Sequence, residues 1–90
     1  MTVELMFHFA PGKNREIIDY LQTPESGAIK VIDPSCGSKH YIYHFSDSTV
    51  RILPFMDQHS ITIYAGEGIQ AVQAKSKLEE ATGIKLEGGL

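Results

Sequence analysis

The chain has 90 residues, a formal net charge of −3, 42% apolar residues and 21% charged residues. This length predicts a single domain and excludes a catalytic domain beside a separate substrate domain. The lysines and arginines form no basic cluster, which argues against nucleic-acid binding, and no run approaches the ~18 apolar residues of a membrane-spanning helix.

The N-terminal segment predicts a strand that leads directly into a helix. Apolar and polar side chains alternate over residues 3–9, which is typical of a strand with one apolar face. Residues 13–22 predict a helix whose buried side carries Ile17, Ile18 and Leu21. Pro24 cannot continue that helix, so we expect a loop to follow.

The middle of the chain contains short apolar runs separated by turn residues, a pattern that predicts an antiparallel meander. The predicted strands cover residues 28–33, 40–45, 49–55 and 60–65.

Gly66-Glu67-Gly68 then predicts a tight turn into a second helix over residues 69–82. Its predicted apolar stripe consists of Ile69, Val72, Ala74 (or the stem of Lys75), Leu78 and Ala81. Gly83 is a favourable residue for ending a helix in the left-handed conformation. We expect a short last strand at 84–87 and a loose tail at 88–90.

The order β-α-β-β-β-β-α-β predicts an α+β domain over residues 1–87. Its architecture is one mostly antiparallel sheet of five to six strands with two helices on one face. Strand alternation predicts which side chains face the helices. They are Val3, Leu5, Phe7, Ile29, Val31, Tyr41, Tyr43, Phe45, Val50, Ile52, Ile61 and Ile63.

The opposite face of this sheet has a mixed apolar and polar character. Its expected members are Met6, His8, Ile32, His40, Ile42, His44, Arg51, Leu53 and Tyr64. An exposed patch of this kind usually marks an interface. We therefore expect a homodimer or partner contact centred on Met6, His8, Ile42, His44, Leu53 and Tyr64.

The start of the first helix is a candidate anion site. Gly12, Lys13, Asn14 and Arg15 combine a glycine, two cations and helix N–H groups, which together can bind a phosphate or carboxylate. The alternative is a solvated helix start in which the cations pair with Glu16 or Asp19.

Carboxylates near strand ends are a second candidate ion site. Asp33, Asp47, Asp57 and Glu67 could bind calcium or magnesium if their loops meet at one rim of the sheet. Asp is also favoured in turns for its local hydrogen bonds, which is the alternative explanation.

Other reactive residues give no catalytic site. Cys36 lies near His40, but a turn between strands is too open for an enclosed nucleophile. A single cysteine also excludes an internal disulfide and suits a reducing compartment, so we expect a cytoplasmic protein. His40 and His44 would lie roughly 13 Å apart on a strand and could not share a metal ion.

Two hypotheses therefore follow from the sequence. The first is a small non-catalytic interaction or regulatory module that self-associates through the open sheet face. The second is a small-ligand or ion-binding domain that uses the helix start or the acidic rim. The sequence identifies no cofactor, and it favours a protein partner over nucleic acid or membrane.

Overall fold

The computed structural model describes residues 2–31, 41–52 and 59–89. Its elements are, in order, β1 (Val3–His8), α1 (Asn14–Leu21), the 3₁₀ turn η1 (Pro24–Ser26), β2 (Ile29–Val31), β3 (Tyr41–Phe45), β4 (Ser48–Ile52), β5 (Ser60–Ala65), α2 (Gly68–Thr82) and β6 (Glu87–Gly88). The predicted α+β class is confirmed. No helix in the described ranges is long and apolar enough to cross a membrane.

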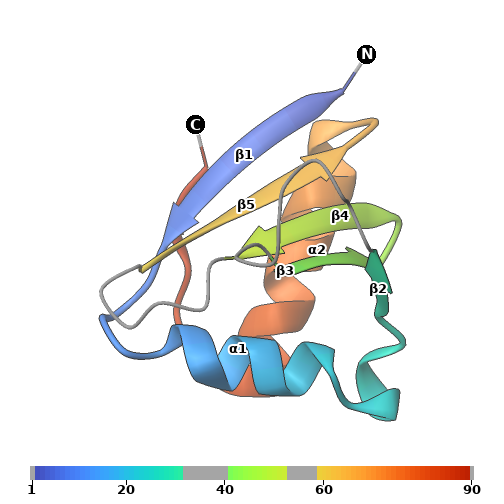
Figure 1. The fold of residues 1–90 in the computed structure, drawn as a ribbon. Coiled ribbons are helices and arrows are strands. Elements are labelled where there is room, and N and C mark those ends of the chain that lie inside the picture. The colour runs from blue at the N-terminus through green and yellow to red at the C-terminus, as the bar shows by residue number, and fades with distance from the viewer. Residues whose placement is uncertain (1, 32–40, 53–58, 90) are drawn as a thin grey trace.

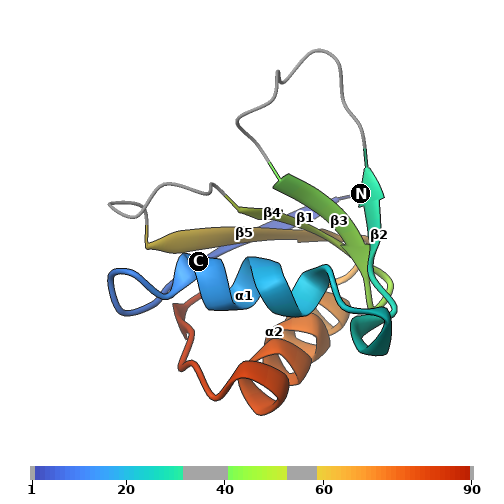
Figure 2. The same ribbon diagram turned by 60° about the horizontal axis from the view of Figure 1, so that its bottom comes forward.

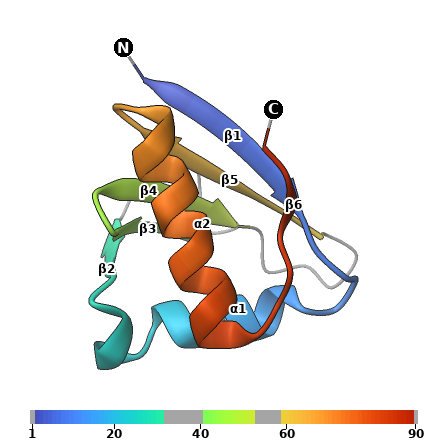
Figure 3. The ribbon, with the colours of Figure 1, turned by 180° about the vertical axis from the view of Figure 1, so that it is seen from behind.

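The six strands form one antiparallel sheet in the order β2-β3-β4-β5-β1-β6 (Figure 1), with β6 visible beside β1 in Figure 3. The strands β2 to β5 form the predicted meander. The N-terminal strand β1 pairs with β5 along its whole length, from Val3 opposite Ala65 to His8 opposite Ser60. This pairing closes the domain, because it joins the start of the chain to a strand almost sixty residues later.

Both helices cover the same face of the sheet (Figure 2). From α1 the side chains of Ile17, Ile18 and Leu21 enter the core, as the sequence predicts. The sheet contributes alternate side chains from each central strand, and those of Phe7, Tyr43, Val50, Ile52, Ile61 and Ile63 are almost fully buried.

The buried side of α2 differs from the predicted stripe. Ala71, Ala74 and Leu78 face the core, whereas Ile69 and Val72 are 63% and 47% exposed. Ala81 is exposed as well. The physical reason is close packing. The small side chains of Ala71 and Ala74 let the axis of α2 approach the sheet, and the larger Ile69 and Val72 lie on other sides of the helix.

The register of β2 also corrects a prediction. Ile29 lies opposite His44 and Val31 lies opposite Ile42, so both β2 residues share the open face with these two residues. The predicted alternation assigned Ile29 and Val31 to the helix-covered face. A three-residue strand carries too little pattern to set its own phase.

The end of the chain is attached to the sheet. Gly83 ends α2 in the left-handed conformation, with φ of +73°, and its N–H donates to the Glu79 carbonyl. Ile84 and Leu86 are buried in the core. The last strand begins later than predicted, at Glu87, and the backbone N–H of Gly89 donates to the Met6 carbonyl at 2.9 Å. The prediction of a loose tail is therefore wrong at residues 88 and 89. Residue 88 pairs with β1, and residue 89 donates a hydrogen bond to it.

Candidate interaction surface

The face of the sheet opposite the helices is a grid of directly opposed side chains. One row crosses the sheet as Ile29, His44, Thr49, Tyr64 and Glu4. The next row consists of Val31, Ile42, Arg51, Thr62 and Met6. A shorter third row contains Ser60, His8 and Glu87. We call these residues the open face; none of the described helices covers it (Figure 2).

The open face includes most of the residues predicted for the interface. Met6, His8, Ile42, His44 and Tyr64 all belong to it. Leu53, with Ile32 and His40 of the wider predicted patch, lies outside the described residues. The sequence pattern missed Ile29 and Val31 because it assigned the wrong phase to β2.

Two shallow hollows occupy this surface and meet at Tyr64. The larger, of about 540 Å³, is lined by Ile29, His44, Thr49 and Tyr64 together with the β3–β4 turn. The smaller, of about 220 Å³, is lined by Glu4, Met6, Arg51, Ser60, Thr62 and Tyr64. The open face is therefore uneven, with depressions into which side chains of a partner can insert.

The histidines of the open face lie apart from each other. His44 is on β3 and His8 is on β1, and the strands β4 and β5 separate them. The Nδ1 atom of His44 lies 3.3 Å from the Thr49 hydroxyl, and the His8 ring lies 6.2 Å from the ring of His59. Within the described ranges, no group of three or more His, Cys, Asp or Glu side chains could hold a metal ion.

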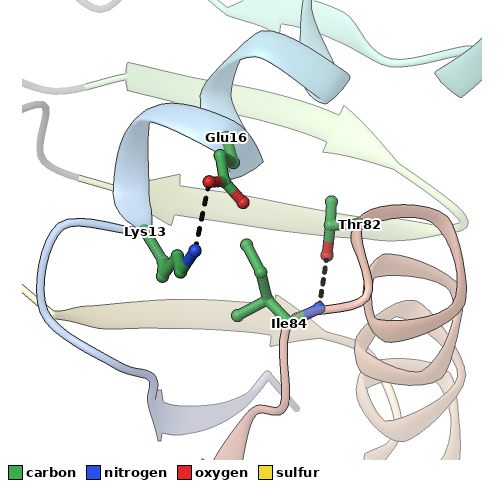
Figure 4. A network of polar contacts seen from close by, with 4 residues as sticks. All are labelled: Lys13, Glu16, Thr82 and Ile84. Atoms are coloured by element: carbon green, nitrogen blue, oxygen red, sulfur yellow. Dashed lines mark hydrogen bonds and ion pairs between the residues drawn. The ribbon is translucent and has the colours of Figure 1, made fainter.

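At the predicted anion site, both cations have intramolecular partners. The Lys13 ammonium lies 3.3 Å from a Glu16 carboxylate oxygen (Figure 4), and the Arg15 Nε lies 3.2 Å from an Asp19 oxygen. Asn14 is buried at the start of α1. These ion pairs are exposed, so each stabilises the fold by only a few tenths of a kcal/mol.

A groove of about 580 Å³ lies beside this helix start. Lys13 and Glu16 line one side, and Thr82 at the end of α2 and Ile84 after it line the other (Figure 4). Lys85 and Glu87 continue this second side. Phe9 and the buried Ile84 add apolar surface. Of the four residues predicted for the anion site, Lys13 lines this groove, whereas Arg15 is directed toward Asp19.

The predicted acidic rim is described only at Asp47 and Glu67, because Asp33 and Asp57 lie outside the described residues. Asp47 forms the two-residue β3–β4 turn with Ser46, and both have positive φ, of +58° and +50°. Glu67 and Gln70 form a capping box at the start of α2, in which the Gln70 side chain accepts the Glu67 N–H at 3.2 Å. Each of these residues thus has a local structural role.

Comparisons of the chain with protein-family models, with curated proteins and with solved structures give no match.

Proposed function

We propose that this chain is a small non-catalytic interaction module that self-associates through its open face. The observation that carries the proposal is the uncovered face itself, where Ile29, Met6 and Ile42 are interspersed with Arg51 and hydroxyl side chains. A mixed surface of this kind is typical of interfaces that form between separately folded proteins. The single cysteine of the chain suits a module that works in the reducing cytoplasm.

A second copy is the partner that the charge distribution favours. Arg51 on β4 and Glu4 on β1 lie on opposite sides of β5. A two-fold axis that runs along β5, between two facing sheets, places β4 of one copy over β1 of the other. Each Arg51 then faces the side of the partner that carries Glu4, so the same contact forms twice.

The test compares two aspartate substitutions at isoleucines on different surfaces. Ile42→Asp introduces a charge into the middle of the open face and should abolish self-association. Ile69→Asp introduces the same charge on the exposed side of α2 and should leave the oligomeric state unchanged. Sedimentation velocity up to millimolar concentration measures both, with circular dichroism to confirm that each variant folds. A wild type that is monomeric throughout contradicts the proposal.

The groove beside α1 supports a second candidate function, the binding of a small anion. Lys13 and Lys85 both line it beside the start of α1, and each forms an ion pair with a carboxylate that a bound anion would replace, Glu16 for Lys13 and Glu87 for Lys85. Phosphate should then shift the amide signals of Lys13 and Lys85 but not that of Lys30, which lies on β2 above the Tyr41 ring. No phosphate-dependent shift at Lys13 or Lys85 would remove this candidate.

A further inference from the structure

A separate pocket lies where the end of α1, the turn η1 and the second half of α2 meet, and it shares no residue with the groove beside the start of α1. Figure 3 shows the crossing of the two helices. The pocket has a volume of about 410 Å³. Tyr20 lines it from α1, Glu25 from η1, Phe45 from the end of β3, and Lys77 and Glu80 from α2. Aromatic and charged side chains from distant parts of the chain thus share one pocket.

The accessible aromatic surface of this pocket belongs to Tyr20. The rings of Tyr20 and Phe45 meet edge to face, with centroids 6.1 Å apart and an angle of 83° between their planes. Phe45 is 4% exposed, whereas Tyr20 is only half-buried, so a ligand reaches the Tyr20 ring. A tyrosine ring attracts a cation that lies over its face.

Side-chain hydrogen bonds order the segment that carries Tyr20 and Glu25. The Thr23 hydroxyl donates to the Tyr20 carbonyl at 2.6 Å, and the Ser26 hydroxyl donates to the Thr23 carbonyl at 2.8 Å. The Ser26 oxygen also accepts the Ala28 N–H at 3.1 Å. Because the turn is already ordered in this way, a ligand that binds between Tyr20 and Glu25 loses little affinity to ordering the chain.

The charged side chains of the pocket are available to a ligand. The ion pairs formed among the described residues do not include Glu25, Glu80 or Lys77, and all three side chains are exposed. The cation–π contacts within the same residues belong to Lys30 and Lys75, so the Lys77 ammonium does not lie over the Tyr20 ring. Two carboxylates against one ammonium favour a cationic ligand.

We propose that this pocket binds the guanidinium group of an arginine. A guanidinium is flat and weakly hydrated, so it stacks on the Tyr20 ring while its N–H groups donate to the carboxylate of Glu25 or Glu80. An ammonium is a compact, strongly hydrated charge and gains less from the aromatic surface. A calcium or magnesium ion takes oxygen ligands and would make no use of Tyr20. The arginine is either the free amino acid or a residue of a partner protein.

The probe is N-acetyl-arginine methylamide, with N-acetyl-citrulline methylamide as its control, because citrulline has a similar shape and a neutral urea group. We expect the arginine probe to shift the amide signals of Glu25, Lys77 and Glu80 in a saturable manner, and the citrulline probe to bind about tenfold more weakly. If free arginine binds more tightly than the blocked probe, the ligand is the amino acid; otherwise it is an arginine within a protein chain. The Ile42→Asp variant should bind the probe as the wild type does, which keeps this test separate from that of the open face.

Two charge variants and one matched control test the electrostatic part of the proposal. Glu80→Gln should weaken binding of the arginine probe about threefold, because it removes a carboxylate at the edge of the pocket. Glu4→Gln removes the same charge on the opposite face of the sheet and should have no effect. Lys77→Gln removes the competing positive charge and should tighten binding about twofold.

The aromatic part is tested at Tyr20. Tyr20→Leu keeps an apolar side chain but removes the ring and should weaken binding about threefold, whereas Tyr20→Phe keeps the ring and should retain the affinity. Circular dichroism confirms that each variant folds. The proposal is overturned if neither arginine ligand shifts the pocket signals, if the citrulline probe binds equally well, or if Glu80→Gln and Glu4→Gln behave alike. Weaker binding to Lys77→Gln would also overturn it, because the pocket would then favour an anion.

Discussion

Ile29 lies directly opposite His44 across β2 and β3, on the side of the sheet that both helices leave uncovered. Ile29 is 67% exposed, the largest exposed fraction among the exposed large apolar side chains of the described residues. This pairing extends the open face to the β2 edge and brings a second apolar residue, Val31, onto it. The surface proposed for self-association is therefore broader than the sequence predicted, because the predicted alternation along β2 had placed Ile29 and Val31 on the helix-covered face.

The close approach of α2 to the sheet can be tested at Ala74, which is fully buried. Ala74→Leu adds three carbon atoms where the helix contacts the strands, and we expect the free energy of unfolding to fall by about 1–3 kcal/mol. The matched control is Ala81→Leu, an exposed position on the same helix, which should change it by less than about 0.5 kcal/mol. Urea unfolding measures both. Equal changes in the free energy of unfolding for the two variants would show that Ala74 does not limit how closely α2 approaches the sheet.

The attachment of the chain end to β1 depends on Gly89. This glycine has a φ of +110°, and a Cβ atom there would lie 3.0 Å from Cε1 of the Phe7 ring. Gly89→Ala should therefore destabilise this region by about 1–3 kcal/mol and accelerate hydrogen exchange of the residue 89 amide.

Gly68→Ala is the control for that substitution. A Cβ at position 68 meets no atom within 4 Å, and Gly68 is the first residue of α2. The alanine should stabilise the protein by about 0.5 kcal/mol, since it restricts the unfolded chain without strain. Unchanged exchange at residue 89 in Gly89→Ala would contradict the account of the chain end.

The buried phenol of Tyr43 predicts a loss of stability in alkali. Burial raises the pKa of Tyr43 above its ordinary value of 10.0, and the Gln22 side chain offsets part of this increase. The unfolded chain therefore releases the phenol proton at a lower pH than the folded protein does. The stabilisation is fully present below pH 10 and is lost as the pH rises through the higher folded-state pKa.

The control for this pH dependence is Tyr43→Phe, which has no phenol to titrate. Its urea midpoint should fall less steeply above pH 10 than that of the wild type. Parallel curves for the wild type and Tyr43→Phe would show that Tyr43 does not contribute to the alkaline transition.

The sequence predicted the elements whose pattern is long and regular. Six alternating residues located β1, and the bounds of β5 agree with the structure. Ile17, Ile18 and Leu21 identified the buried side of α1 because they are its large apolar residues. These elements follow from local periodicity, which the tertiary fold preserves.

The predictions that failed depend on contacts between distant segments. The phase of β2 is fixed by its partner β3, and the buried side of α2 is fixed by how closely Ala71 and Ala74 allow it to approach the sheet. The attachment of residues 88 and 89 to β1, where the sequence predicted a loose tail, requires the strand order, which places β6 beside β1. None of these relationships is encoded within a single short segment.

The most direct test of self-association is an isotope-filtered NOE experiment on a mixture of labelled and unlabelled protein. The proposed two-fold arrangement places the Met6 methyl group of one copy over β4 of the other. We predict NOEs from that methyl group to the Arg51 and Thr49 side chains of the unlabelled copy. An absence of intermolecular NOEs at millimolar concentration, or NOEs that join Ile69 of one copy to the other, would contradict the account.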